Sequence, residues 1–340
     1  MEVEEDPTAG TYEKKRRDDE TARLRAVQYA LAVSGVGFPG SPPGIRALQA
    51  LALLCQIGNL IYIGFWMRWD KSDDAVRSES YDGVWALEQI IPLVFLHYIA
   101  CSKERESFLS AVRVVSLKPW MIFAPLIPVI GFAIVDLSFP QHKKYYTVPS
   151  DIFSYLPCAV GSIVIFCYAD SFAKKLPKER NPQQLKEAVI VYNRETNRAM
   201  ARLNMWFVLP NVLIWLIFTM INLWYTLGMI LKPTDDDDEG DYNNPWYNGL
   251  NTALSTMMVY FLLLPLATYT GESQKWVYGV HTELCNGDVA NIAFIMWLKD
   301  SELGWELANV KLTPERLSTL GYFLTMCLIS TASFFMQNVI

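Results

Sequence analysis

Apolar residues along this chain collect into seven stretches, and the charged residues lie mainly between them. Each stretch is long enough, or nearly so, to cross about 30 Å of hydrocarbon as a helix. Soluble cores do not separate charge in this way, so the pattern predicts an all-α membrane protein with seven transmembrane helices. The stretches are Arg46–Trp69, Val84–Cys101, Pro119–Phe139, Ile152–Phe172, Met205–Leu231, Leu250–Thr270 and Leu317–Ile340.

The segments between and around these stretches define four regions. Residues 1–43 form an N-terminal segment with a short amphipathic helix from Glu20 to Ser34, which a Gly- and Pro-rich turn ends. Residues 44–270 form a six-helix transmembrane bundle, and the third stretch is expected to kink because it contains three prolines. Residues 271–316 form a cytoplasmic anchor region with an apolar patch too short to cross, and 317–340 form the last transmembrane helix.

Composition alone does not distinguish a soluble domain from a membrane bundle, since 52% of residues are hydrophobic and 19% are charged. The distribution of basic residues predicts orientation. The N-terminal segment and the second, fourth and sixth loops hold 23 of the 29 Lys and Arg residues. Because positive residues stay inside, the N-terminus is expected in the cytoplasm and the C-terminus outside. The net charge of −6 gives no reason to expect a nucleic-acid partner.

Candidate catalytic and metal-binding residues are sparse. The three histidines are scattered over different spans and loops, and the sequence contains no zinc-protease, serine-hydrolase or phosphate-loop motif. The six cysteines lie in or beside the spans or in a cytoplasmic loop, so no disulfide framework is expected. The sequence therefore predicts neither an enzyme nor a cofactor. Intramembrane acid catalysis by Glu88 and Asp136 stays open as a minor alternative.

The last stretch carries the most informative pattern. At 100° per residue, five side chains of the helix share one face, which we call the polar stripe: Thr319, Met326, Ser330, Ser333 and Gln337. Small hydroxyls on a membrane helix often mark close helix packing, which is one interpretation. The other interpretation is that this face of the helix lines a water-filled path.

The end of the chain resembles a known signature. Residues 330–338, Ser-Thr-Ala-Ser-Phe-Phe-Met-Gln-Asn, occupy the frame of the C-terminal motif of gustatory receptors, although only Gln337 matches its polar part strictly. Thr331 and Asn338 depart from that motif, which has Tyr and Phe there. The predicted topology is similar as well. The chain thus resembles a divergent gustatory-receptor-like member of the insect odorant and gustatory receptor superfamily.

This resemblance implies a homotetramer in the plasma membrane that works as a ligand-gated, weakly selective cation channel. The last helices of four copies would line one central pore, with the polar stripe facing permeating cations. A nonconducting scaffold or a small-molecule transporter on the same seven-helix fold is the alternative.

The resemblance also implies a ligand pocket in the outer half of the six-helix bundle. Aromatic residues around a few polar groups suit a small, mostly apolar ligand. Glu88 is costly inside a membrane, so it is a functional candidate, although a hydrogen bond to a neighbouring helix, such as one to Asn222, explains it equally well. The candidate ligand-binding residues are Trp85, Glu88, Gln89, Phe132, Asp136, Tyr155, Asn222, Tyr225 and Ser255.

Overall fold

The computed structural model describes residues 7–37, 41–69, 75–115, 118–138, 148–179, 181–231, 245–284, 289–301, 303–322 and 325–326. In chain order the elements are α1 (Pro7–Val33), α2 (Pro43–Trp69), α3 (Ala75–Cys101), α4 (Glu104–Val114), α5 (Pro119–Phe123), α6 (Leu126–Ser138), α7 (Val148–Lys174), α8 (Pro182–Leu203), the π-helix η2 (Asn204–Val208), α9 (Leu209–Leu231), α10 (Pro245–Leu284), α11 (Val289–Asp300), β1 (Glu306–Leu307) and β2 (Val310–Lys311). The last helix is described over residues 314–322 and 325–326.

Within the described ranges, five helical segments are long and apolar enough to cross a membrane, which by length and composition makes this a multi-pass membrane protein. They match five of the predicted spans. The third predicted span is divided into α5 and the shorter apolar helix α6, with a turn at Ala124 and Pro125. Proline removes a backbone N–H and disfavours helix in the preceding residue, which explains the break. The seventh predicted span lies largely outside the described residues. The five segments are Pro43–Gly64, Val84–Cys101, Pro149–Lys174, Pro182–Trp224 and Tyr247–Leu284.

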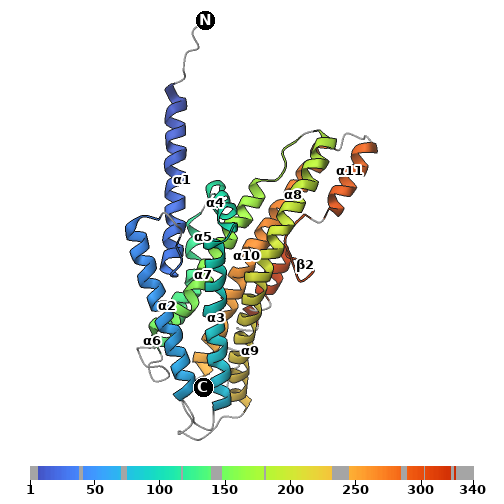
Figure 1. Cartoon of the computed structure of the whole chain (residues 1–340). Coiled ribbons are helices and arrows are strands. Elements are labelled where there is room, and N and C mark those ends of the chain that lie inside the picture. The colour runs from blue at the N-terminus through green and yellow to red at the C-terminus, as the bar shows by residue number, and fades with distance from the viewer. Residues whose placement is uncertain are drawn as a thin grey trace.

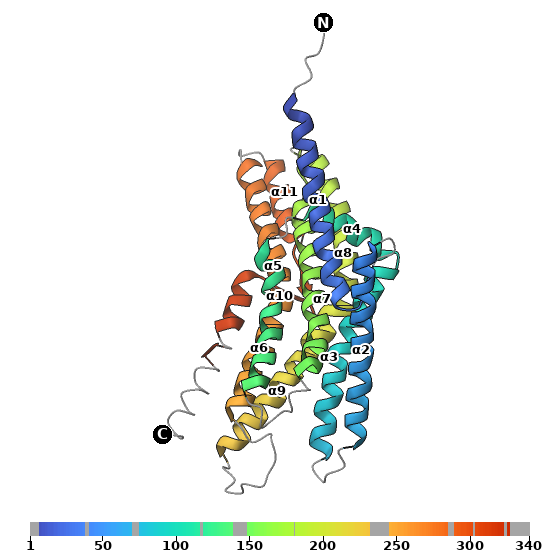
Figure 2. The ribbon, with the colours of Figure 1, turned by 90° about the vertical axis from the view of Figure 1, so that its left-hand side faces the viewer.

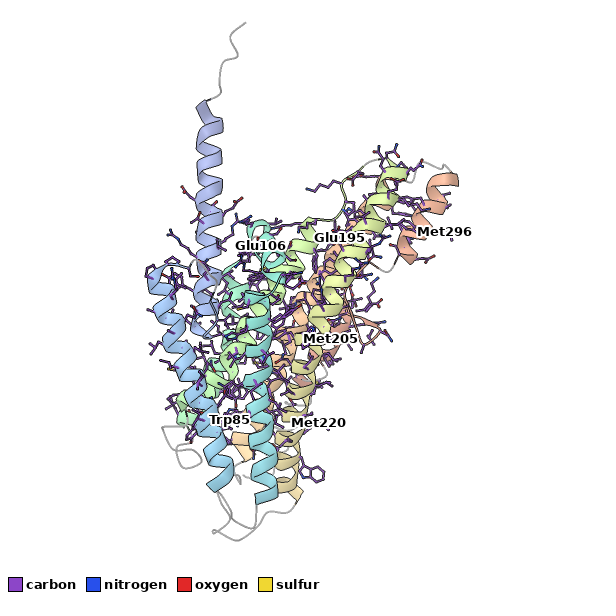
Figure 3. The ribbon with its side chains drawn as sticks, viewed as in Figure 1. Trp85, Glu106, Glu195, Met205, Met220 and Met296 are labelled. Carbon is purple, nitrogen blue, oxygen red and sulfur yellow. The ribbon has the colours of Figure 1, made fainter. Side chains whose placement is uncertain are left out.

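The outer surface of the bundle is apolar along three helices. Large hydrophobic side chains at helical spacing are exposed on α2, α6 and α9, and Met220, labelled in Figure 3, is one of them. Such continuous apolar faces are unusual in water and are the normal surface toward lipid. These side chains are Leu51, Leu54, Ile57, Ile61, Ile127, Ile130, Ile134, Leu137, Leu213, Leu216, Ile217, Met220 and Trp224.

Helix α7 is the centre of the bundle, with α2, α3, α4, α6 and α10 packed around it. Its close packing depends on Gly161, because a Cβ atom there would lie 2.2 Å from the ring of Phe207. That ring in turn stacks on Phe95 of α3 with centroids 4.4 Å apart. One glycine thus lets three membrane helices meet.

Helices α8 and α9 form one continuous rod that contains the π-helix η2, and α10, which is 40 residues long, packs beside α9. Figure 1 shows α8 and α11 projecting at the end of the bundle that we call the upper end. Helix α8 thus extends the rod on the N-terminal side of the predicted span Met205–Leu231. The π-helix was not predicted, since hydropathy carries no signal for a single wider turn.

Helix α1 is longer than predicted, because it begins at Pro7 instead of Glu20. It runs along the bundle and not across it, and its first half extends beyond the upper end (Figures 1 and 2). Among its described side chains, the first buried one is Val27, which packs in the core with Leu31. The predicted turn follows at Gly35, where φ is +80° and an added Cβ atom would lie 2.9 Å from the Cα of Leu53, so the position requires glycine.

A small hairpin before the last helix departs from the all-helical expectation. Strands β1 and β2 pair antiparallel through a turn at Ala308 and Asn309, both with positive φ. Trp305, which precedes the hairpin, is fully buried. The hairpin places the last helix against the bundle, as described below.

Candidate functional site

The predicted ligand-binding residues are buried inside the bundle wherever their side chains are described. Figure 3 places Trp85 in the lower half of the bundle, far from the upper end that carries Glu195. Tyr225 belongs to α9, but its side chain lies outside the described residues. The buried candidates divide into four groups of contacts.

The first group is an aromatic cluster between α6, α7 and α9. The Phe132 ring lies 4.5 Å from that of Tyr155 and 5.8 Å from that of Trp215, measured between centroids. Phe218 completes the cluster at 5.7 Å from Trp215. The Trp215 indole donates a hydrogen bond to the Cys158 sulfur at 3.2 Å. Two predicted residues, Phe132 and Tyr155, thus meet two aromatic residues that the prediction did not include.

The second group joins α6 to α10 through a carboxylate. The Tyr247 hydroxyl donates a 2.9 Å hydrogen bond to Oδ1 of Asp136, and both residues are buried. A carboxylate in an apolar environment needs such donors, so this contact provides one of them. The prediction included Asp136 and missed Tyr247.

The third group is a polar cluster between α2, α3 and α7. The Asn59 amide nitrogen donates to Gln89 Oε1 at 2.9 Å, to Ser154 Oγ at 3.0 Å and to the Ser150 carbonyl at 3.2 Å. The Gln89 amide nitrogen donates to the Gln56 carbonyl at 3.1 Å. Gln89, a predicted ligand-binding residue, therefore has both ends of its amide bonded to α2.

This polar cluster was only partly predictable. Gln56 and Asn59 are polar residues three positions apart within an apolar stretch, a spacing that puts them on one helix face. That signal could have identified them. Their partners Ser150 and Ser154 carry a weaker signal, because serine is common in membrane helices.

The fourth group links α9 to α10. The Thr219 hydroxyl donates to Ser255 Oγ at 3.0 Å, and Ser255 donates to the Asn251 carbonyl at 2.7 Å. One turn along α9, the Asn222 amide nitrogen donates to the Phe218 carbonyl of its own helix at 2.9 Å. Ser255 and Asn222 therefore both contribute to contacts at or beside this helix pair.

Glu88 lies on α3 and is completely buried. Its charge is near enough to act on the Cys158 thiol of α7, and that thiol accepts the hydrogen bond from Trp215 of the aromatic cluster. A titratable group in the same part of the bundle as aromatic rings suits a site for an apolar or weakly cationic molecule.

The described part of the last helix begins with a cap. The Arg316 amide donates to the Thr313 hydroxyl at 3.3 Å, and Pro314 occupies the first turn, as the sequence predicts. Hydrogen bonds from its own backbone and from Thr313 lower the pKa of Glu315. Leu317 is buried against the core, whereas Thr319 and Met326 are exposed. The other residues of the polar stripe, Ser330, Ser333 and Gln337, lie outside the described residues.

Trp305 fixes the segment that leads into the last helix. Its indole donates to Oδ1 of Asn204 at 2.7 Å, and its backbone amide donates to the Thr270 hydroxyl at 2.9 Å. The Asn204 amide nitrogen donates to the Glu306 carbonyl at 2.6 Å. Asn204 is the first residue of the π-helix, which directly precedes α9. These hydrogen bonds therefore connect the N-terminal end of α9 to the segment that leads into the last helix.

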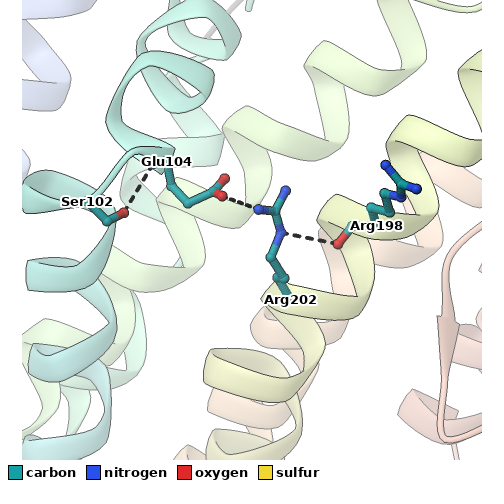
Figure 4. A network of polar contacts seen from close by, with 4 residues as sticks. All are labelled: Ser102, Glu104, Arg198 and Arg202. Atoms are coloured by element: carbon teal, nitrogen blue, oxygen red, sulfur yellow. Dashed lines mark hydrogen bonds and ion pairs between the residues drawn. The ribbon is translucent and has the colours of Figure 1, made fainter.

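A groove of about 960 Å³ lies at the upper end, between the end of α7 and α8. Both its walls and its rim carry charges, including Glu195, Arg198 and Arg202. Figure 4 shows the Arg202 guanidinium paired with Glu104 of α4, while the Arg198 side chain extends away from that pair. Arg202 also donates to the Arg198 carbonyl at 3.3 Å. Among the described residues, no cluster of three or more His, Cys, Asp or Glu side chains could hold a metal ion.

No family model matches the sequence. No curated protein matches it either. Among solved structures, the fold is similar to that of the insect olfactory receptor OR5 from Machilis hrabei, with a TM-score of 0.45 and 9% sequence identity over 90% of this chain and 96% of that chain.

Proposed function

We propose that this chain is one subunit of a homotetrameric, ligand-gated and weakly selective cation channel of the gustatory-receptor-like type. The observation that carries the proposal is the last helix. It contacts the core through the buried Leu317, and the first two residues of its polar stripe, Thr319 and Met326, are exposed among the described residues. If the helix continues with the same face outward, the hydroxyl and amide groups of the stripe suit a pore wall shared between copies.

The proposed pore chemistry follows from the residue types. Neutral hydroxyl and amide groups at Thr319, Ser330, Ser333 and Gln337 offer oxygen dipoles to a cation without a fixed charge. They would replace hydration water only in part, which predicts weak selectivity among cations. Met326 supplies an apolar constriction between the polar positions, and Gln337 forms a neutral ring near the outer mouth.

The proposed orientation puts the upper end in the cytoplasm. The charged segments there include α1 and α8, which are rich in Lys and Arg as the positive-inside rule requires. The lower half, with Trp85, Glu88 and the aromatic cluster, then lies in the outer half of the plasma membrane. This is the proposed site for a small, mostly apolar ligand.

The proposed path from ligand to pore uses α9. The aromatic cluster includes Trp215 and Phe218 of α9, and Asn204, 11 residues before Trp215 in the same rod, is hydrogen-bonded to Trp305. A ligand that separates the aromatic rings would shift α9, and that shift would reach the last helix through the hairpin. The ligand opens or closes the pore only to the extent that it binds the shifted state of α9 more tightly than the unshifted one.

Substitution in the polar stripe tests this proposal. Gln337→Arg places a positive charge in each of four subunits at the outer mouth, so it is expected to abolish cation current through purified protein in a bilayer. Lys299→Arg, at the exposed end of α11, conserves charge outside the pore and serves as the control. Normal cation current in Gln337→Arg would remove the last helix from the pore wall.

A nonconducting scaffold is the second candidate, and a feature of the sequence favours it. Phe334, Phe335 and Met336 stand together near the outer end of the last stretch, where three bulky side chains per subunit could close a narrow pore. In that case Phe334→Ala and Phe335→Ala together would produce current in a protein that is otherwise silent.

A further inference from the structure

The rod formed by α8, η2 and α9 changes from a charged to an apolar surface within about one helical turn. Arg202 is exposed near the end of α8, and Met205 and Trp206 of the π-helix follow it with exposed fractions of 59% and 49%. Figure 3 places Met205 between Glu195, at the upper end, and Met220, on the apolar face of α9. Tryptophan is typical of the depth at which lipid chains meet head groups. Arg202 therefore lies at the level of the head groups.

Two apolar stripes meet below Arg202, one on α3 and one on α9, and these helices pack against each other. Tyr98 lies one turn beyond the exposed Val94 on α3, and Trp206 lies two turns before the exposed Leu213 of α9. The rings of Tyr98 and Trp206 stack with their centroids 6.0 Å apart. We call this the α3–α9 surface, and its exposed residues include Leu87, Ile90, Val94, Trp206, Leu213 and Ile217.

The groove above this surface is basic at its membrane end. Helix α8 runs toward the membrane, so the order of its residues gives their depth. Glu187 and Glu195 line the part of the groove that is farther from the membrane. Arg198 and Arg202 line the part nearest to the membrane, and Lys175, just after α7, also lines the groove. An anion in the groove is therefore attracted to its membrane end.

Both arginines at the membrane end keep N–H donors for a further partner. Arg202 pairs with Glu104 and donates to the Arg198 carbonyl, yet its side chain remains 47% exposed. Within the described residues, no carboxylate forms an ion pair with Arg198, and Figure 4 shows its side chain extending away from Glu104. A guanidinium carries several N–H donors in a planar fork, which matches the oxygens of a phosphate.

The α3–α9 surface lies away from the proposed pore. Figure 2 shows α3 and α8 on one side of the bundle and the described start of the last helix on the other side. A pore lined by the last helix therefore leaves the α3–α9 surface facing lipid. The occupant that meets both an apolar surface in the membrane and arginines at its edge is a lipid with a negatively charged head group.

We propose that the membrane end of the groove binds the head group of a phospholipid with a phosphorylated inositol ring, and that its acyl chains lie on the α3–α9 surface. Arg198 and Arg202 are about 6 Å apart along α8, so each can contact a different phosphate of one head group. The groove, of about 960 Å³, has room for such a ring. The proposal rests on the orientation given above, which puts the site in the leaflet that carries these lipids.

Lipid binding to the purified full-length protein in detergent, counted by native mass spectrometry, tests the basic half of the site. The probe is phosphatidylinositol bisphosphate with eight-carbon chains, and phosphatidylcholine with the same chains is the reference. We expect the inositol lipid to bind much more tightly than the reference, and Arg198→Gln to weaken its binding about five-fold. Arg194→Gln is the matched control, because Arg194 is an exposed arginine one turn earlier on α8 that does not line the groove.

A pair of methionine substitutions tests the apolar half. Met205→Ser puts a polar group directly below Arg202 and is expected to weaken binding of the inositol lipid several-fold. Met220→Ser is the matched control, since Met220 is also exposed but lies about 22 Å deeper along the rod, beyond the reach of eight-carbon chains. Free inositol trisphosphate, which has no chains, should bind more weakly than the lipid and should not respond to Met205→Ser.

The outcomes separate this proposal from the proposed channel. Equal binding of the inositol lipid and phosphatidylcholine, or unchanged binding in Arg198→Gln, would overturn the lipid site. Free inositol trisphosphate binding as tightly as the lipid would also overturn it, because the ligand would then be a soluble phosphate. None of these results requires a tetramer or a current. Lipid binding by a protein that conducts no cations would support the site and contradict only the channel.

Discussion

The junction between the π-helix and Trp305 gives the sharpest prediction about how the last helix is held. Asn204→Leu keeps a side chain of similar size and removes two hydrogen bonds, one accepted from the Trp305 indole at 2.7 Å and one donated to the Glu306 carbonyl at 2.6 Å. Each hydrogen bond contributes about 0.5–1.5 kcal/mol net, so the pair contributes about 1–3 kcal/mol. The upper part of that range is expected, because Trp305 is fully buried and its N–H would lose its partner.

The measurement is thermal unfolding of the purified protein in detergent, together with hydrogen exchange over the hairpin. Asn204→Leu should lower the unfolding temperature by several degrees and speed exchange in residues 305–311, since that segment loses its attachment to α8. Asn197→Leu is the matched control, because Asn197 is an exposed residue of the same helix. If both variants unfold and exchange alike, the Asn204 contacts do not hold the hairpin.

Three further substitutions test the packing and the candidate site. Gly161→Ala should lower the free energy of unfolding by about 1–3 kcal/mol, because its new Cβ meets the Phe207 ring, whereas Gly58→Ala, with open space around it, should not. Asn59→Leu should cost about 2 kcal/mol in detergent, since its three hydrogen bonds each contribute roughly 0.6 kcal/mol between membrane helices. Glu88→Gln should weaken the ligand response with normal expression; an unchanged response would exclude Glu88 from the site.

Hydropathy predicted the membrane helices well, because the apolar run of a span is the direct consequence of crossing lipid. Helices α2, α3, α7 and α10 each contain a predicted span, η2 and α9 together contain the fifth, and Pro125 interrupts the third as expected. The hydropathy pattern could not show how far each helix continues beyond its apolar span. Helix α10 continues to Leu284 and α1 begins at Pro7, since polar residues propagate a helix as readily as apolar ones.

The sequence identified buried polar residues of the candidate site but not the residues that they contact. Buried polar residues such as Glu88, Gln89 and Asp136 are visible in a sequence because they interrupt apolar spans. Their partners depend on how helices rotate against one another, which a single sequence does not encode locally. The contact between Asp136 and Tyr247 joins residues 111 positions apart, and nothing near either residue indicates the other.

The π-helix and the hairpin are two further features that the sequence pattern did not predict. A π-turn widens one turn of the Asn204–Val208 segment without changing its hydropathy. The positive φ of Asn309 is compatible with its residue type, but that of Ala308 is not typical, so tertiary contacts and not local preference determine the turn. Both features lie where α9 connects to the last helix.

The central claim is that four copies of the last helix form a cation pore, and one measurement tests it most directly. Purified full-length protein of measured mass is reconstituted in a planar bilayer, and currents are recorded with Na⁺ or K⁺ on one side and a large impermeant cation on the other. The account predicts a tetramer with cation currents of similar size for Na⁺ and K⁺, and their loss in Gln337→Arg. A monomer, or currents that Gln337→Arg leaves unchanged, would contradict it.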